Sequence, residues 1–348
     1  MDPQESAPPT LAPAASRSDL RRLRVAAIQV PSRLGAIEEN LARAERMAVD
    51  AAAQGAALIL FHELMPSGYA WDTRAWMGAE PSNGATSRWL AAIAQRLGAW
   101  VGTSFLEAAD GDFWNTFVLV SPYGQEAGRV RKEFPAMFEA RTFRGDPGSH
   151  VIETSLGRIG VGICFDAHTA SVARRFAAAD VELVLAPHCY CVPARTSRTV
   201  SAKDIERLRS NIAGLAPLLA GALGVPVITT NRVGPWDADR GSPYVFVGQA
   251  TIADSSGAVA ARLGDAEGIA IGDVTLDPAR RTRTPPRAYS RWVYPGPPGR
   301  ELLRLVEWWA GRQYRRDPDR RRMATTASEG LVDSEGTELR AAPPSTNG

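Results

Sequence analysis

The chain alternates between short, continuous apolar runs and longer stretches in which apolar residues recur every three or four positions. An apolar run at 24–30 is followed from Ala36 by apolar positions at the wider spacing, and a second apolar run at 57–61 comes next. Continuous runs are typical of buried strands, and the three-to-four spacing is typical of amphipathic helices. The pattern therefore predicts strand, helix, strand, with His62 and Glu63 where the second strand ends.

Turn residues at short spacing mark the next part of the chain as antiparallel. A predicted helix at 85–97 leads to strands at 100–106, 113–120 and 125–130, which are separated by Asp-Gly and Pro-Tyr-Gly turns. Such turns join antiparallel neighbours. The sheet is therefore expected to be mixed, and 131–141 to leave it as an irregular loop.

The stretch from 155 onward repeats the strand, helix, strand pattern and organises the prediction of function. Its first strand ends at Cys164, a helix is predicted at 169–179, and the second strand ends at 187–188. In open α/β sheets the reactive crevice lies beyond the carboxyl ends of the strands, so Cys164 is a candidate nucleophile. A helix that begins there would lower the pKa of the thiol and bind an oxyanion. The alternative is a buried structural cysteine.

An uncharged run at 212–230 requires a choice between a membrane span and buried secondary structure. Two prolines and three glycines interrupt it, which favours a buried helix followed by a buried strand. The remaining predicted elements are a helix at 202–223 and strands at 225–230, 248–254, 258–262 and 268–275.

Composition places the chain among ordinary globular proteins. Its 348 residues are 45% apolar and 22% charged, which allows a sizeable core. The net charge is +2, and 300–322 alone holds eight Arg against four acidic residues, so the core gives no support for nucleic-acid binding. Three cysteines, Cys164, Cys189 and Cys191, cannot form a disulfide framework, which favours a reducing compartment and a cytoplasmic location.

The two ends of the chain differ in composition from its middle. Residues 1–22 are rich in Pro, Ala and Ser without the basic and apolar regions of a signal peptide, which predicts a disordered leader. A single domain is expected at 23–282. The arm at 283–316 is Pro-rich, then aromatic and basic, and packing on its own core or on a neighbouring subunit is favoured over a membrane surface. The polar tail at 317–348 is expected to be disordered.

Three reactive side chains, Glu63, Lys132 and Cys164, each follow a predicted strand. Together a thiol, a carboxylate and an ammonium can split an acyl–nitrogen bond. Cys164 supplies the nucleophile, and Glu63 takes its proton and later passes it to the leaving amine. Lys132 holds the oxyanion, with the backbone N–H of Phe165 as a second donor. Only two of the 40 basic residues are Lys, so the choice of Lys at 132 suggests a requirement that Arg does not meet.

Four ordered motifs resemble the nitrilase superfamily of carbon–nitrogen hydrolases over about 23–277. They are Glu63-Leu64 with Gly68-Tyr69, Arg131-Lys132 with Glu139 and Gly145-x-x-Gly148 downstream, Gly160-Val-Gly-Ile-Cys-Phe-Asp166, and Asn231-Arg-Val-Gly234 with the final hairpin. The resemblance implies an α-β-β-α sandwich with two mixed sheets. It also implies a homodimer or higher homo-oligomer, in which the arm at 283–316 crosses to the partner subunit. It also implies that Glu139 positions Lys132 and the substrate. No metal or organic cofactor is implied.

The residues around the nucleophile select among the activities of this superfamily. Cys-Phe-Asp resembles the amidase and carbamoylase branches, whereas nitrilases carry Cys-Trp-Glu. We therefore predict hydrolysis of a small amide or N-carbamoyl compound through a Cys164 thioester. The alternatives are nitrile hydrolysis, an acyltransferase in which an amine replaces water, and a binding module without catalysis. His62 replaces a Pro that is common before the Glu, and Val247-Gly-Gln-Ala250 also departs from the family pattern.

Candidate substrate contacts surround the three reactive positions. Tyr69, Trp71 and Phe138 suggest an aromatic wall, and His168 and His188 are further candidates. His188-Cys-Tyr-Cys191 with His168 lacks the paired spacing of a structural zinc site, so no metal is expected.

Overall fold

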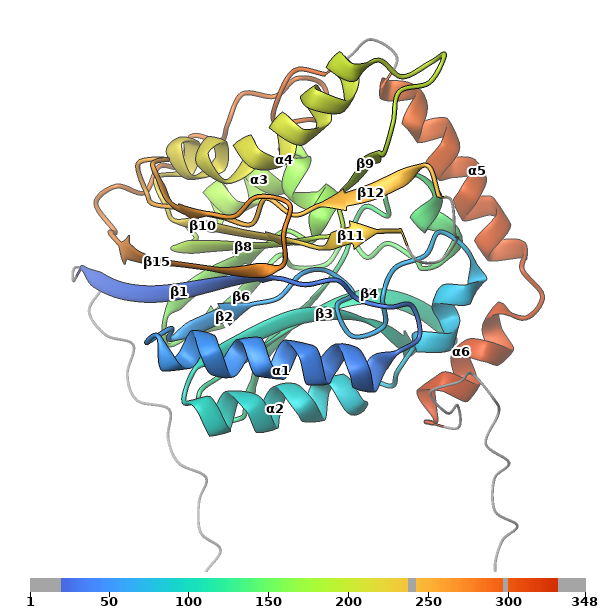
Figure 1. Ribbon diagram of the computed structural model, residues 1–348, viewed down its shortest axis with the longest axis horizontal. Coiled ribbons are helices and arrows are strands. Elements are labelled where there is room, and N and C mark those ends of the chain that lie inside the picture. Colours follow the sequence, from blue (N-terminus) through green and yellow to red (C-terminus); the bar gives the residue numbers. More distant parts are fainter. Residues whose placement is uncertain (1–19, 237–241, 297–299, 331–348) are drawn as a thin grey trace, which may run out of the picture.

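Two six-stranded sheets lie face to face at the centre of the computed structural model, with helices on both outer sides (Figure 1). The structure describes residues 20–236, 242–296 and 300–330. From one outer face to the other, the layers are helix, sheet, sheet, helix. This is the sandwich with two mixed sheets that the sequence resemblance implied.

The first sheet is parallel in its middle and antiparallel on both sides. Its order is β15 (Gly268–Leu276), β1 (Arg21–Gln29), β2 (Leu58–Leu60), β3 (Trp100–Ala109), β4 (Asp112–Val120) and β5 (Glu126–Arg131). β1, β2 and β3 run parallel, and the other three strands are antiparallel to their neighbours.

The second sheet follows the same plan. Its order is β14 (Val259–Arg262), β13 (Thr251–Ala253), β10 (Val227–Asn231), β8 (Leu183–His188), β7 (Gly157–Val161) and β6 (Val151–Thr154). β7, β8 and β10 are parallel, and the rest are antiparallel. A small third sheet consists of β11 (Val233–Pro235), β12 (Tyr244–Val247) and β9 (Cys191–Pro193).

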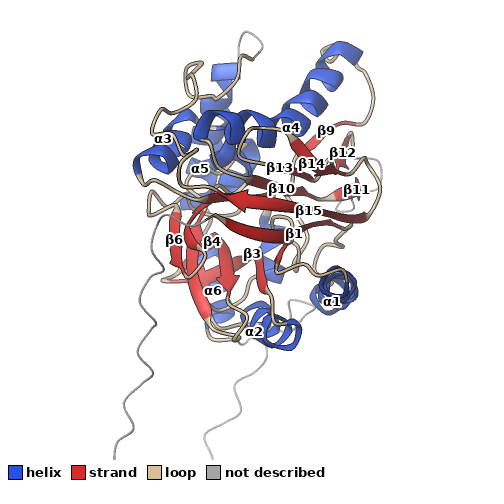
Figure 2. Ribbon diagram, turned by 90° about the vertical axis from the view of Figure 1, so that its left-hand side faces the viewer, coloured by secondary structure: helices blue, strands red, loops and turns tan. Residues whose placement is uncertain are grey.

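Helices cover both outer faces of the sandwich. They are α1 (Ile37–Ala53), α2 (Ala85–Leu97), α3 (Ala170–Ala178) and α4 (Ala202–Leu223). α1 and α2 lie below the first sheet and α3 and α4 above the second, as both views show (Figures 1 and 2). Between the sheets, Leu58 and Phe117 of one pack in a single buried cluster with Ile159 and Leu185 of the other.

The apolar pattern predicted most of these elements. The helices at 85–97 and 202–223 have the predicted bounds, and the predicted hairpins of 100–130 are antiparallel. The uncharged run is the second half of α4 followed by β10. In the described ranges, no helix combines the length and the apolar character that a membrane crossing requires.

The expectation of disorder from 317 onward is wrong for 317–330. After α5 (Leu303–Arg316), a further helix, α6 (Arg320–Ser328), buries Ala324 and Ala327. This helix contacts β3 and β4. A polar contact adds to these, in which Arg320 of α6 donates a hydrogen bond to the Gly111 carbonyl at 2.9 Å. A stretch with few apolar residues can therefore order on a core that other segments build, and composition does not reveal this.

The structure describes the arm at 283–316 and the leader at 1–22 in part. α5 packs on the chain's own loop after β5, and its Tyr314 donates a hydrogen bond to Asp112 at 3.0 Å. Crossing of the arm to a second copy stays a prediction. The predicted leader overlaps β1, which begins at Arg21, while 1–19 and 331–348 lie outside the described residues.

Substitution of Phe176 in α3 tests how the helix layer packs on the second sheet. It is fully buried, and a Cβ at Gly160 would lie 2.9 Å from its ring, so the ring lies directly against the strand backbone. Phe176→Ala is expected to lower the free energy of unfolding by about 3 to 5 kcal/mol, measured by urea denaturation. Leu305→Ala, at a side chain that is 64% exposed, should change it by less than about 0.5 kcal/mol. Equal effects of the two changes would contradict this packing.

Candidate active site

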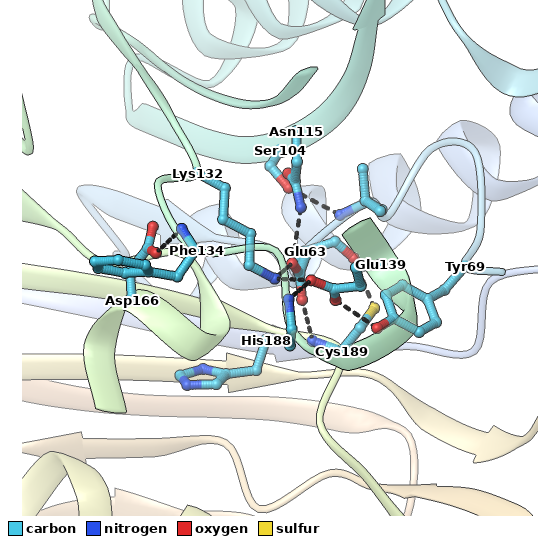
Figure 3. A network of polar contacts seen from close by, with 12 residues as sticks. Glu63, Tyr69, Ser104, Asn115, Lys132, Phe134, Glu139, Asp166, His188 and Cys189 are labelled. Atoms are coloured by element: carbon cyan, nitrogen blue, oxygen red, sulfur yellow. Dashed lines mark hydrogen bonds and ion pairs between the residues drawn. The ribbon is translucent and has the colours of Figure 1, made fainter. Parts of the chain in front are cut away.

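The loops that carry the three predicted reactive residues meet at one end of the sandwich. Glu63 lies just beyond β2, and Lys132 directly follows β5. Cys164 is the first residue of the short 3-10 helix η3 (Cys164–His168), which follows β7. Figure 3 shows Glu63, Lys132 and Glu139 side by side.

Lys132 lies between two carboxylates. Its Nζ donates to Glu63 Oε1 at 2.7 Å and to Glu139 Oε2 at 2.6 Å, and all three side chains are completely buried (Figure 3). Burial opposes the charged form of Lys132, but the carboxylates of Glu139 and Glu63 outweigh burial and raise the pKa of Lys132 well above its usual value. Lys132 therefore stays an ammonium.

Glu63 is held by a side-chain amide and by a backbone amide as well as by Lys132. Asn115 of β4 donates from Nδ2 to Oε1 at 2.7 Å, and the backbone N–H of Cys189 donates to Oε2 at 2.7 Å. Both carboxylate oxygens thus have fixed donors. Sequence reasoning missed Asn115 and Cys189, because a polar residue inside a strand and a backbone N–H leave no motif.

Glu139 has the supporting position that the resemblance implied. It belongs to the 3-10 helix η2 (Met137–Arg141), and the backbone N–H of Ala136 donates to its Oε2 at 2.7 Å. The Tyr69 hydroxyl donates to Oε1, and burial raises the pKa of Glu139 against the opposing pull of the Lys132 ammonium. Tyr69 therefore bonds to the carboxylate network through its hydroxyl, while its ring packs edge-on against Trp71.

Cys164 lies in a constrained turn beside this network. Its φ is +48°, in the left-handed region that residues with a side chain rarely adopt, and it is 6% exposed. Burial raises the pKa of its thiol well above the usual value, and the negative charge of Glu63 adds to this. The Lys132 charge and the backbone N–H of Cys189 act in the opposite direction. The expectation of a lowered pKa is wrong, because burial and the neighbouring carboxylates outweigh the Lys132 charge and the Cys189 N–H.

Asp166 connects the turn at Cys164 to the loop that carries Lys132. Its carboxylate accepts from the backbone N–H groups of Glu133 at 3.1 Å and Phe134 at 2.9 Å (Figure 3). Burial raises the pKa of Asp166 to about 6. The structure thus gives a positioning contact to the Asp of Cys-Phe-Asp. Phe165, which lies between Cys164 and Asp166 in the sequence, packs its ring edge-on against Trp292 with centroids 4.9 Å apart.

An aromatic cluster lies on the Tyr69 side of the network. Trp71 donates from Nε1 to the Tyr69 hydroxyl at 2.9 Å, and its ring lies 5.5 Å from the Phe138 ring. Trp71 and Phe138 are half-buried. The predicted aromatic wall is therefore assembled, and its further members, which sequence reasoning did not include, are Trp236, Tyr244 and Phe246.

His168 and His188 form a buried pair on another side of the site. Their ring centroids are 5.2 Å apart at an interplanar angle of 85°, and the side chains are 1% and 0% exposed. Burial lowers the pKa of His188 to about 4 and that of His168 well below its usual value, so both are neutral at neutral pH. Within the described ranges no cluster of three His, Cys, Asp or Glu side chains is arranged to hold a metal ion.

Comparison with known proteins identifies the family. A family model for carbon-nitrogen hydrolases matches residues 24–284. The chain belongs to this family, a part of the nitrilase superfamily. This carbon–nitrogen hydrolase is 28% identical over 260 residues to an N-carbamoylputrescine amidase of Arabidopsis thaliana, across 71% of this chain and 85% of that one.

Solved structures share the fold of this carbon–nitrogen hydrolase. An amidase from Nesterenkonia sp. has a TM-score of 0.61 at 22% identity, and the match covers 76% of this chain and 94% of that chain. A carbon-nitrogen hydrolase from Helicobacter pylori G27 also has a TM-score of 0.61, at 21% identity, with 85% and 95% covered.

The raised pKa of Cys164 can be tested by alkylation of the hydrolase with iodoacetamide. Because the thiolate is the reactive form, the labelling rate should keep rising with pH beyond about 8.5, the usual value for a free thiol. Peptide mass spectrometry of samples labelled from about pH 6 to about pH 10 measures the rate at Cys164 on both sides of that value. Glu63→Gln removes the neighbouring negative charge and should shift the profile to lower pH.

The shape of this profile, unlike the absolute rate, does not depend on how easily the reagent reaches the sulfur. A plateau below about pH 8 in the unaltered protein would show a preformed thiolate and contradict the assignment.

Proposed function

We propose that this chain hydrolyses the C–N bond of a small amide or N-carbamoyl compound through a thioester on Cys164. The observation that carries the proposal is the buried Glu63–Lys132–Glu139 network beside a thiol in a constrained turn. The backbone N–H of Cys189 links them, because it donates to Glu63 and also acts on the pKa of Cys164. Such a site fits general-base activation of a nucleophile.

The first step forms a bond between the Cys164 sulfur and the acyl carbon. The thiol proton passes to Glu63, and the carbonyl electron pair moves onto oxygen. Since burial keeps Cys164 protonated at rest, this proton transfer accompanies the attack instead of preceding it.

Among the described residues, the hydrogen bonds of Lys132 leave one of its donors for the oxyanion that results. An ammonium carries three N–H groups, and Glu63 and Glu139 accept two of them. The third N–H, together with the backbone N–H of Phe165, is available for the tetrahedral intermediate. Glu139 and Asn115 then act as positioning residues, because they hold Lys132 and Glu63 in place.

Collapse of the intermediate breaks the C–N bond. Glu63 returns its proton to the leaving nitrogen, which departs as an amine, and the acyl group remains as a thioester. Water then gives a proton to Glu63 and attacks the thioester carbon, and Cys164 regains its proton as the acid leaves. The chemistry balances with amide and water as the only reactants.

The names of the relatives support amide and N-carbamoyl substrates. The Arabidopsis relative is an N-carbamoylputrescine amidase, and a further relative is an omega-amidase. In the Nesterenkonia amidase, a structure of a Glu-to-Gln mutant contains acrylamide added to the active-site cysteine. These relatives favour hydrolysis of amides over hydrolysis of nitriles.

The thioester is the decisive intermediate to trap. Incubation with a panel of small amides and N-carbamoyl compounds, followed by intact-mass spectrometry, should show an acyl adduct that Cys164→Ala abolishes. Peptide mapping should place the adduct at Cys164, with Cys189 and Cys191 as internal controls. A broad panel that gives neither adduct nor turnover would favour a binding module without catalysis.

Lys132→Arg tests the oxyanion role. The wide guanidinium fork cannot keep two carboxylate contacts and present a third donor to the same point. We expect normal folding by circular dichroism and a loss in kcat on the order of 10² to 10³. Lys203→Arg, at an exposed site on α4, should leave kcat unchanged. Near-normal rates in Lys132→Arg would contradict the assigned role.

A further inference from the structure

The segment that carries Glu139 depends on its surroundings for its conformation. η2 is a short 3-10 helix, and Met137 at its start has a φ of +52°, in the left-handed region that residues with a side chain rarely adopt. Short 3-10 helices have poor hydrogen-bond geometry, and a strained residue persists only where the surrounding structure holds it. The Glu139 carboxylate nevertheless accepts from Lys132 at 2.6 Å in a completely buried position. Contacts from other parts of the chain therefore have to fix η2.

Trp76 makes the first of these contacts, at the C-terminal end of η2. It belongs to the 3-10 helix η1 (Thr73–Gly78), is 2% exposed, and donates from Nε1 to the backbone carbonyl of Thr142 at 2.7 Å. Thr142 in turn donates to the backbone carbonyl of Glu139, from its N–H at 2.7 Å and from its hydroxyl at 2.8 Å. A continuous chain of hydrogen bonds thus leads from the Trp76 indole to the backbone of Glu139.

Two aromatic rings hold the Trp76 indole in place. Phe113 of β4 stacks on it with centroids 5.0 Å apart, and Tyr314 of α5 packs edge-on against it with centroids 6.2 Å apart. All three side chains are buried. The Tyr314 hydroxyl accepts from the backbone N–H of Phe113 at 3.0 Å and donates to Asp112 at 3.0 Å, so the tyrosine is itself attached to β4. The indole therefore lies between a strand of the first sheet and the C-terminal arm.

α5 also contacts η2 directly. It lies along one end of the sandwich (Figure 1) and packs on η2. Gly311 of α5 faces Ala140, the residue after Glu139, because a Cβ at Gly311 would lie 3.9 Å from the Ala140 Cβ. The Arg141 guanidinium lies 5.8 Å from the centroid of the Trp309 ring. The C-terminal arm of this chain therefore packs against the segment that carries Glu139.

We propose that Trp76 and Tyr314 are positioning residues, which hold η2 so that Glu139 keeps Lys132 directed at the oxyanion. This inference rests on the proposed function, in which Lys132 donates to the tetrahedral intermediate. It gives the C-terminal arm a part in the active site of its own chain. A displacement of η2 lengthens the hydrogen bond between Lys132 and Glu139, and the rate of a catalysed step responds steeply to small errors in position.

Substitutions that remove single polar groups test this positioning. Trp76→Phe keeps an aromatic ring but loses the donor to Thr142. On an amide that the unaltered enzyme turns over, we expect kcat to fall on the order of 10- to 10²-fold, with KM within about threefold of its original value. Tyr314→Phe keeps the ring and loses both hydroxyl contacts, so a smaller loss in kcat of about threefold to tenfold is expected.

Thr154→Val is the matched control for Tyr314→Phe. The Thr154 hydroxyl also makes two hydrogen bonds, because it donates to the Gly157 carbonyl at 2.8 Å and accepts from the backbone N–H of Leu156 at 3.0 Å. These residues lie at the turn between β6 and β7. The control should leave kcat unchanged, and circular dichroism with the thermal midpoint checks the folding of every variant.

A double-mutant cycle separates positioning from a purely structural role. Glu139→Gln keeps the shape of the side chain and removes the charge that attracts Lys132. If Trp76 acts through Glu139, Trp76→Phe should cost much less in the Glu139→Gln background than in the unaltered enzyme. The same fold-loss in both backgrounds would give Trp76 a structural role alone and overturn the inference.

The pH profile of Cys164 labelling by iodoacetamide gives a readout that needs no substrate. The negative charge of Glu139 contributes to the raised pKa of Cys164, so Glu139→Gln should shift the profile to lower pH. Trp76→Phe should shift it in the same direction, and Thr154→Val should not. An unshifted profile and a normal kcat in Trp76→Phe would overturn the inference and leave the proposed hydrolase function intact. Absence of turnover and of any Cys164 adduct in the unaltered protein counts against the proposed function, and the labelling profiles then decide the positioning role separately.

Discussion

A buried ammonium between two buried carboxylates is the constraint on which the rest of this structure depends. Removing one partner from such a group leaves an uncompensated charge in a low-dielectric interior, at a cost of about 3 to 5 kcal/mol. Glu63 comes from the loop after β2, and Lys132 and Glu139 come from the loop after β5. Asn115, Tyr69 and two backbone N–H groups complete their hydrogen bonds. The sandwich must therefore bring several loops to one place before any of these charges is tolerated there.

The same network acts on the protonation state of the Cys164 thiol. Two carboxylates surround one ammonium, and Cys164 is buried beside them, so the thiolate form is disfavoured. In the proposed mechanism, the sulfur therefore becomes a strong nucleophile only as its proton passes to Glu63. Cys164 has a positive φ just beyond β7, and the Asp166 contacts to Glu133 and Phe134 keep that turn against the lysine loop.

Sequence patterns predicted the site residues that follow strands, but not those that lie within a strand or contribute through the backbone. Glu63 and Cys164 were placed at the site because each follows a buried apolar run, and parallel strands end at the same edge of a sheet. Asn115 lies within β4 and Cys189 contributes through its backbone, so neither produces a local pattern. α6 was missed because its order depends on contacts with β3, β4 and Gly111, which are far away in the chain. The arrangement of the aromatic cluster likewise requires the third sheet, whose short strands carry little periodic signal.

Burial of the site also restricts the charge of what it can accept. Glu63, Lys132 and Glu139 are completely buried, and each is already bonded to described partners. An anionic acyl group would approach two carboxylates, and a cationic one would lose its water to carboxylates that are already engaged. A neutral acyl group avoids both costs.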